Sequence, residues 1–238
     1  MLNHIPVEKV MYIDIETVPQ HPSFEHLDEK MQELWEVKSS KTAKDDVTPD
    51  EDYVRAGIYS EFGKIVCISA GVIKPVDGHR TLRVKSFFGD DEKKLLTEFS
   101  SALNNFTSNP GTNICGHNVK EFDFPYIARR IIINGLPLPP VLDVAGKKPW
   151  EVNFIDTMDL WKFGDYKHFT SLNLLTHILG IPTPKDDIDG SQVASVYYDE
   201  NDVERIARYC EKDVLATAQL FLRLKGEPLM DPEKMISV

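Results

Sequence analysis

Two carboxylates stand two residues apart inside an apolar, β-branched run near the start of the chain. Asp14 and Glu16 belong to the segment Lys9–Val18, which stops at Pro19 and is predicted to form a buried strand. Residues two apart on a strand point to the same face, so both carboxylates project together. Burying two acids is costly unless a cation compensates them, and carboxylate oxygens suit Mg²⁺ or Mn²⁺. The alternative is a strand whose polar face meets water.

A third acid, Asp123, lies two residues before Pro125 in the segment GHNVKEFDFPYI, residues 116–127. Proline is favoured in the first turn of a helix, so a helix is predicted to begin here and to end at Asn134–Gly135. A carboxylate at such a start can cap the exposed backbone N–H groups. Capping is therefore the alternative to a catalytic role for Asp123.

Tyr209 and Asp213 are four residues apart on a predicted helix over residues 202–224, so they share one helix face one turn apart. Asp213 also lies on the stripe of Ile206 and Cys210, which the helical period predicts to be buried. A carboxylate on that stripe needs a partner. The alternative is a core tyrosine beside a surface acid.

The elements that must position these residues follow an α/β pattern. Strands are predicted at residues 9–18, 64–73, 82–88 and 113–116, and helices at about 92–106, 125–134, 170–180 and 202–224. Three early strands followed by helices that alternate with short strands indicate a mixed sheet.

Residues 20–60 do not fit this rhythm, because they hold ten acids against five bases. Leu27, Met31, Leu34 and Trp35 mark an amphipathic helix, so we predict a partly helical surface insertion. A flexible acidic loop is the alternative for its second half, residues 39–52. The remaining chain is predicted to be one domain over residues 1–226, followed by a tail at 227–238 that extends over the surface.

Composition narrows the classes of protein further. The 238 residues carry a net charge of −11, which argues against a passive coat for DNA, RNA or anionic lipid, although an enzyme can still reach phosphates through metal ions. No apolar run approaches the roughly eighteen residues of a membrane span, and no secretory signal is visible. The three cysteines include no CxxC pair and are predicted to be reduced and buried. We expect a cytoplasmic protein with no membrane partner.

In their order and spacing, the three acid-bearing features resemble those of the DEDDy 3′–5′ exonucleases. The nearer resemblance is to the proofreading exonuclease domain of family B DNA polymerases. Residues 116–127 resemble that family's second motif, and residues 172–190 resemble the segment that leads to its third. The similarity runs from about Val10 to Leu224, which leaves no room for a polymerase palm or fingers. The chain therefore resembles a stand-alone exonuclease.

The resemblance implies an RNase H-like fold, with a five-stranded mixed sheet flanked by helices. It also implies two divalent metal ions, Mg²⁺ or Mn²⁺. Asp14, Glu16 and Asp213 would hold the first ion, and Asp14 would bridge to the second. Asp123 would act through water or phosphate oxygens, and Tyr209 would orient the attacking water. Such two-metal hydrolysis needs no protein nucleophile.

The resemblance also implies contacts with substrate. Glu16 and the backbone of Thr17 would meet the terminal 3′-hydroxyl, while Asn118 and Phe122 would lie along the last nucleotides. Base stacking on an aromatic ring tolerates any sequence, although a core role is an equal alternative for Phe122. Lys185 is a candidate for contact with a phosphate.

The leading hypothesis is a 3′–5′ exonuclease that releases nucleoside monophosphates from the 3′ end of single-stranded DNA, with a role in DNA repair. The alternatives are an exoribonuclease of the RNase D or oligoribonuclease type and a catalytically silent nucleic-acid-binding module. The presence of all five motif residues argues against the silent module. The sequence does not identify a protein partner, and its negative charge predicts weak, metal-dependent capture of one strand end.

Two further predictions concern polar residues near the motifs. His117 is expected to make a structural hydrogen bond as a neutral imidazole. Arg129 and Arg130 are expected on a solvated helix face.

Overall fold

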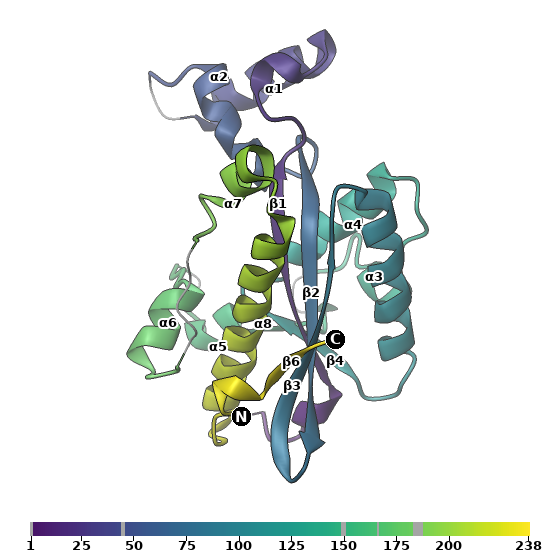
Figure 1. Ribbon diagram of the computed structural model, residues 1–238, viewed down its shortest axis with the longest axis vertical. Coiled ribbons are helices and arrows are strands. Elements are labelled where there is room, and N and C mark those ends of the chain that lie inside the picture. The colour runs from purple at the N-terminus through teal and green to yellow at the C-terminus, as the bar shows by residue number, and fades with distance from the viewer. Residues whose placement is uncertain (1, 44–45, 149–150, 166, 183–187) are drawn as a thin grey trace.

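The computed structural model describes residues 2–43, 46–148, 151–165, 167–182 and 188–238. At its centre is a six-stranded mixed sheet in the order β5-β4-β1-β2-β3-β6 (Figure 1). Its strands are β1 (Val10–Pro19), β2 (Gly63–Val76), β3 (His79–Phe88), β4 (Asn113–Gly116), β5 (Ile155–Asp156) and β6 (Met235–Ser237). The β1–β2 and β2–β3 pairs are antiparallel, whereas β4 runs parallel to β1, β5 to β4 and β6 to β3.

The predicted α/β fold with a mixed sheet flanked by helices is confirmed, but the sheet has one strand more than expected. The additional strand is β6, which pairs with β3 through Leu82–Met235 and Val84–Ser237. The segment 227–238, expected as a surface tail, thus contributes an edge strand. Its three strand residues are too few for a periodic signal in the sequence.

Helices cover both faces of the sheet (Figure 1). The long helix α8 (Val203–Lys225) packs on β1, β2 and β3 on one face, and α3 (Glu92–Thr107) and α4 (Asp123–Ile133) cover the other. The short helices α5 (Thr157–Lys162) and α6 (Leu172–Ile178) lie beside α8. None of the helices in the described part of the chain has an apolar stretch long enough to cross a membrane.

The alternation of side chains along β1 decides which residues meet which helix. Met11, Ile13 and Ile15 join the hydrophobic cluster that includes α3 and α4, whereas Tyr12 joins the cluster that includes α8. Because residues two apart share a face, the two acids that follow Tyr12 in this alternation are directed toward α8.

The boundaries of α8 agree with the helix predicted over residues 202–224 to within one residue. The side chain of Asp202 caps it by accepting a hydrogen bond from the Arg205 N–H at 2.9 Å, and Gly226 ends it in the left-handed region at φ 75°. Ile206, Cys210 and other residues of the predicted stripe are buried against the sheet.

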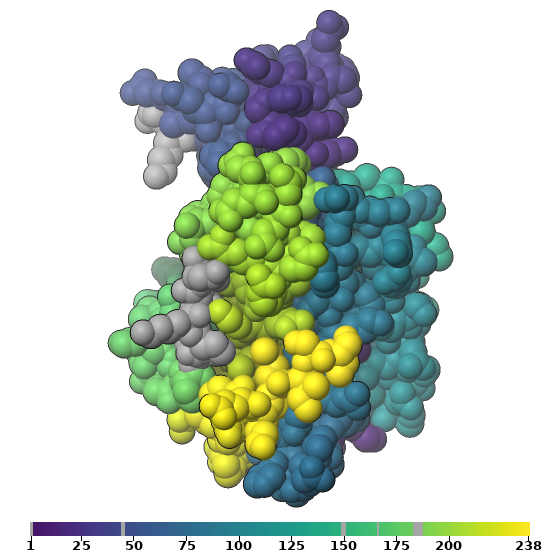
Figure 2. Space-filling view, in the orientation of Figure 1, coloured from purple at the N-terminus to yellow at the C-terminus, as the bar shows by residue number. Residues whose placement is uncertain are grey.

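The insertion is helical and has a small core of its own. It contains the 3₁₀ turns η2 (Phe24–His26) and η3 (Tyr53–Ile58) and the helices α1 (Glu29–Thr42) and α2 (Pro49–Asp52). Trp35 is fully buried, stands edge-on to Phe62 at 5.1 Å between ring centroids, and donates a hydrogen bond to the Pro49 carbonyl. Leu34, predicted on the apolar face, is instead exposed. Figure 2 shows the insertion as a projection at one end of the molecule.

Arg130 corrects one prediction. Arg129 is exposed as expected, but the Arg130 side chain is buried and donates to both carboxylate oxygens of Glu92, at 2.8 and 2.5 Å. It also donates to the carbonyl of Ser60, and Glu92 accepts the backbone N–H of Ile65. A paired arginine can be buried where a lone one cannot, and its partner lies 38 residues away in the chain.

Candidate active site

Asp14 and Glu16 meet the side chain of Cys210 where β1 crosses α8. One oxygen of each carboxylate and the Cys210 sulfur lie within 4.8 Å of one another. Glu16 is buried and Asp14 partly buried. The pairing of β1 with β2 shifts register between Glu16 and Thr17, an irregularity of the kind that redirects side chains next to active sites.

Asp123 joins this cluster from the other side of β1. It is the first residue of α4, and the N-cap position belongs to Phe122, which makes no side-chain capping bond. The backbone N–H groups of Asp123 itself and of Ile15 stabilise its carboxylate and partly offset the rise in its pKa that burial causes. Asp123 therefore lies beside β1 at Ile15, between Asp14 and Glu16. A residue that only capped α4 would not need to lie next to this strand.

Tyr209 and Asp213 complete the set from α8. The Tyr209 hydroxyl is hydrogen-bonded to the Asp213 side chain, as their spacing of four permits. Burial and the negative charges of Asp213, Glu16 and Asp14 raise the pKa of Tyr209 well above its usual range, so the phenol stays protonated. The structure thus brings together all five residues that the sequence predicted as catalytic.

The carboxylates disturb one another strongly. Burial is the largest cause of the raised pKa values of Asp14, Glu16 and Asp123, and the charge of Asp213 raises all three further. The pKa of Asp123 rises to about 7. Within the described ranges, no lysine or arginine forms an ion pair with Asp14, Glu16 or Asp123. Such a set of hard oxygen donors fits a divalent cation of the Mg²⁺ or Mn²⁺ type.

Cys210 is part of the site, although the sequence indicated only a buried small residue. Burial raises the pKa of its thiol, so it remains protonated and donates to Asp14 Oδ2 at 3.3 Å and to the Asp14 carbonyl at 3.4 Å. A protonated thiol is a weak donor that orients a carboxylate and does not act as a soft metal ligand. The helical period predicted that Cys210 is buried. Its contact with Asp14 depends on where α8 crosses β1, which the sequence does not show.

Asp156 is a second residue that the sequence analysis missed. Its buried carboxylate caps α5 through the Met158 N–H at 2.9 Å and accepts the backbone N–H groups of Asn118 and Lys120 at 2.9 and 3.1 Å. It thereby holds the turn that precedes Asp123, in which Asn118 adopts a left-handed φ of 61°. An acid after an apolar pair and before a helix is an N-cap signal that could have identified it.

His117 has the structural role that the sequence predicted. Its Nε2 donates to the Thr170 carbonyl at 2.9 Å, and its Nδ1 lies 2.9 Å from Thr157 Oγ1. Burial lowers the pKa of the imidazole, which keeps it neutral. The ring therefore links the turn before Asp123 to the loop before α6.

A cleft of about 410 Å³ opens beside the acid cluster. Glu16 and Thr17 of β1 and Phe122 line it together with η3 of the insertion and residues 190–194. Of the predicted substrate contacts, these three are therefore in place, whereas Asn118 is absent from the described lining. Lys185 lies outside the described residues.

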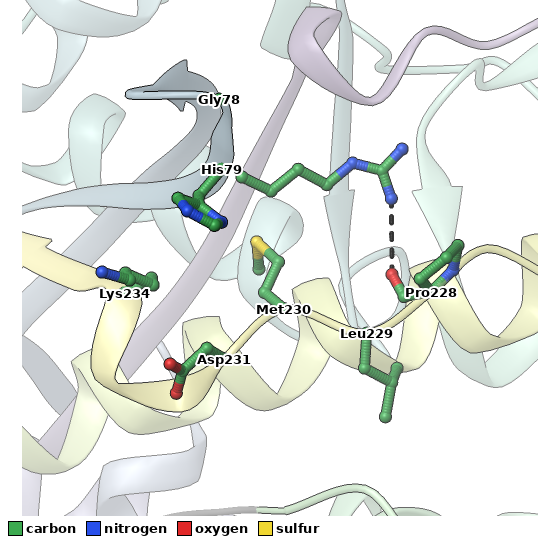
Figure 3. Close-up of a pocket in the computed structure, with 8 residues that line it drawn as sticks. Gly78, His79, Pro228, Leu229, Met230, Asp231 and Lys234 are labelled. Carbon is green, nitrogen blue, oxygen red and sulfur yellow. Dashed lines mark hydrogen bonds between the residues drawn. The ribbon is translucent and has the colours of Figure 1, made fainter.

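A second pocket, of about 460 Å³, lies at the opposite end of the sheet, between the β2–β3 turn and residues 228–234 (Figure 3). It is lined by residues such as His79, Met230 and Lys234 and by none of the five predicted catalytic residues. Its Arg80 guanidinium donates to the Pro228 carbonyl at 3.3 Å. Glu16 and the strand that carries Asp14 are instead at the other cleft.

A family model matches well over half of the chain. The family is described as a predicted 3′–5′ exonuclease related to the exonuclease domain of PolB, and its model matches residues 57–230. That range includes Asp123, Tyr209 and Asp213 but begins after Asp14 and Glu16, which lie beyond the insertion. The match shows the family, while the roles of the individual acids rest on the sequence motifs and on their places in the fold.

The fold is similar to part of a solved polymerase structure. The family B DNA polymerase of the hyperthermophilic archaeon Pyrobaculum calidifontis matches 92% of this chain with a TM-score of 0.57 and 16% sequence identity. The match covers 24% of the polymerase, so this chain spans about a quarter of that protein's length. The similarity at this identity is one of fold.

Proposed function

Because this chain belongs to the family of predicted 3′–5′ exonucleases related to the exonuclease domain of PolB, we propose that it hydrolyses single-stranded DNA from the 3′ end with two divalent metal ions. The products would be nucleoside 5′-monophosphates. The observation that carries the proposal is that Asp14 and Glu16 of β1 lie together beside an open cleft, with Asp123 of α4 and Asp213 of α8 near enough for their charges to raise the pKa values of both.

The residues that would hold the ions are Asp14, Glu16, Asp123 and Asp213. The raised pKa values of Asp14, Glu16 and Asp123 reflect burial and the negative charge of neighbouring carboxylates, and bound divalent ions would compensate that charge. When bound, two such ions activate water and stabilise the leaving 3′-oxygen. Mg²⁺ and Mn²⁺ are the candidates, since all four side chains offer carboxylate oxygens.

The remaining residues of the site position groups. Tyr209 stays protonated, and because its hydroxyl hydrogen donates to Asp213, its oxygen lone pairs can accept a hydrogen bond from the attacking water. The Cys210 thiol restrains the rotamer of Asp14 by donating to one of its oxygens. Asp156 holds the turn that leads to Asp123. None of these roles requires a protein nucleophile.

The substrate end would enter the cleft beside Glu16. Glu16 and the Thr17 backbone would meet the terminal 3′-hydroxyl, and the half-buried Phe122, 5.5 Å from the Tyr126 ring between centroids, would contact a base. Stacking of this kind contributes about 1–3 kcal/mol per base and is tolerant of sequence. The net charge of −11 agrees with capture of one strand end in preference to wrapping of a duplex.

The test uses DNA and RNA oligonucleotides of the same sequence, labelled at the 5′ end, with Mg²⁺, Mn²⁺ or EDTA. We expect a ladder that shortens from the 3′ end of the DNA, with monophosphates as products and no reaction in EDTA. Faster shortening of the RNA would reassign the substrate. Activity that persists in EDTA would contradict the metal-dependent proposal.

A further inference from the structure

The cleft beside the acid cluster is closed on one side by the insertion. Three elements form it: β1 at the base, the 3₁₀ turn η3 as one wall, and the segment 190–194 before and within α7 (Val193–Ser195) as the other. Figure 1 shows α7 below the insertion and beside the end of β1 that leads into it. A segment that interrupts the regular α/β pattern thus lies where the substrate end would sit.

The side chains that η3 places in this wall are apolar and exposed. Val54 and Ile58, four residues apart, are 68% and 49% exposed, and both line the cleft. Neither contributes to the small core around Trp35. Exposed apolar side chains grouped in a cleft mark a surface that a ligand covers, and aliphatic contact suits the flat face of a nucleobase.

Arg55 supplies the positive charge of the same wall. It is the basic residue among the described residues that line the cleft, and its side chain is 44% exposed. Its Nη1 donates to Asp52 Oδ1 at 3.0 Å and to the Thr42 carbonyl at 3.3 Å, which holds the guanidinium at the rim. A guanidinium has five N–H donors in a planar fork that matches phosphate oxygens.

The wall is held firmly against β1. At Gly57 a Cβ atom would lie 3.0 Å from the Val18 carbonyl carbon and 3.1 Å from the Pro19 nitrogen, so a larger residue would require the strand backbone to shift. The Tyr126 hydroxyl donates to the Gly57 carbonyl at 2.8 Å. On the opposite side, Tyr198 donates to the Pro19 carbonyl at 2.6 Å. Both walls are therefore tied to the end of the strand that carries Glu16.

We propose that η3 is a nucleotide-binding wall, in which Val54 and Ile58 contact the base of the 3′-terminal nucleotide and Arg55 contacts a phosphate of the same strand. The cleft is continuous with the proposed metal site, because Glu16 lies beside Asp14 and also lines the cleft. A nucleotide strand whose end reaches the metal site would therefore occupy the cleft. The cleft volume of about 410 Å³ is within the range of roughly 300–1,000 Å³ found for small-ligand sites. This inference rests on the proposed exonuclease function.

The test compares Val54→Asp and Ile58→Asp with Val37→Asp. Val37 is also an exposed residue of the insertion, but it is absent from the cleft lining, so it is the matched control. With a 5′-fluorescein-labelled 15-nucleotide oligothymidylate and Mn²⁺, we expect the KM of each cleft variant to rise at least fivefold and the control to match the wild type. Thermal melting checks that all three variants fold.

Arg55→Gln should also raise KM at least fivefold, and Arg55→Lys should restore part of the loss. Lys30→Gln removes one positive charge from α1, where Lys30 pairs with Glu33, and is the charge control. A lower melting temperature of Arg55→Gln would report loss of the contact with Asp52. An unchanged melting temperature with a raised KM would report loss of the contact with substrate. An unchanged KM in Arg55→Gln would remove Arg55 from the proposal.

Two measurements separate failure of this inference from failure of the proposed function. Wild-type cleavage of bis(p-nitrophenyl) phosphate with Mn²⁺ reports on the metal-dependent centre by itself. Anisotropy of the labelled oligothymidylate in Ca²⁺ reports on binding without requiring turnover. If the cleft variants bind the oligonucleotide as tightly as Val37→Asp does, the wall is not a nucleotide site, whether or not the diester is cleaved.

Discussion

Acids on opposite faces of the same sheet, Glu92 on one and Asp14 and Glu16 on the other, have different partners. On the α3 face, Glu92 receives two hydrogen bonds from Arg130, one from the Ile65 N–H and one from the Asn134 side chain. On the α8 face, Asp14 and Glu16 lie beside further carboxylates, and the charges of Asp213 and Asp123 raise the pKa values of both.

This difference in partners distinguishes Glu92, which stabilises the fold, from Asp14 and Glu16, which are proposed to bind metal ions. A buried carboxylate with a bidentate arginine and backbone donors is neutralised within the protein, and it ties elements together. Buried carboxylates that face one another weaken the folded state until a cation binds. The same residue types can therefore be assigned opposite roles from their partners.

The strongest test of this contrast replaces one acid of each group by its amide. Asp14→Asn should lower kcat on the order of 10³-fold or more, because it removes a proposed metal ligand. In EDTA at neutral pH it should also raise the melting temperature, since it removes a mutually repelling charge. Glu92→Gln should lower the melting temperature and retain metal-dependent cleavage per folded molecule. Activity of Asp14→Asn within tenfold of the wild type would remove Asp14 from the site.

The next largest effect is expected at the arginine of the structural pair. Arg130→Met should destabilise the protein by about 3–5 kcal/mol, because Glu92 would stay buried without its partner. Urea unfolding monitored by tryptophan fluorescence measures this loss. The double variant Glu92→Gln/Arg130→Met should recover part of it. A loss below about 1 kcal/mol would show that Glu92 gains water or another partner.

Tyr209→Phe tests whether the phenol positions a reacting group. We expect kcat to fall about 10- to 100-fold, because the attacking water would no longer be held in position. The Mn²⁺ concentration for half-maximal rate should change little. Tyr197→Phe is the matched control, since Tyr197 also donates to a carboxylate, that of Asp90, at 2.6 Å. Equal rates for the two variants would assign Tyr209 to packing.

The last test is the dependence of stability on pH, which changes gradually from one pH unit to the next. Asp123 has a pKa of about 7 in the fold against 3.8 for the unperturbed group, so the folded state retains a proton that the unfolded chain releases. In EDTA, this group's contribution to stability is therefore present below about pH 4 and is lost as the pH rises toward 7, by at most about 1.4 kcal/mol per pH unit.

Asp123→Asn should flatten this slope, and so should saturating Mn²⁺ in the wild type. Urea unfolding at intervals between pH 5 and pH 8 compares them. A wild-type slope in EDTA equal to that of Asp123→Asn would show that the carboxyl is already ionised in the metal-free fold.

Local patterns in the sequence were sufficient to place residues relative to others on the same strand or helix. Alternation along a strand placed Asp14 and Glu16 on one face, and the helical period placed Tyr209 one turn from Asp213. The Asp202 cap likewise marks the start of α8 within its own first turn. Such signals are local because they follow from backbone geometry repeated over a few residues.

Contacts between elements were decided only by the tertiary structure. Cys210 lies 196 residues from Asp14, and Arg130 lies 38 residues from Glu92, so neither contact follows from a local period. The same holds for β6 on β3 and for Arg55 and Val54 in the cleft wall. The sequence alone determined which carboxylates could do chemistry and on which faces of their elements they lie. The crossing of β1 with α8 and the close approach at Gly57 decided what surrounds them, because packing between distant segments depends on the whole set of side chains that fill the space between them.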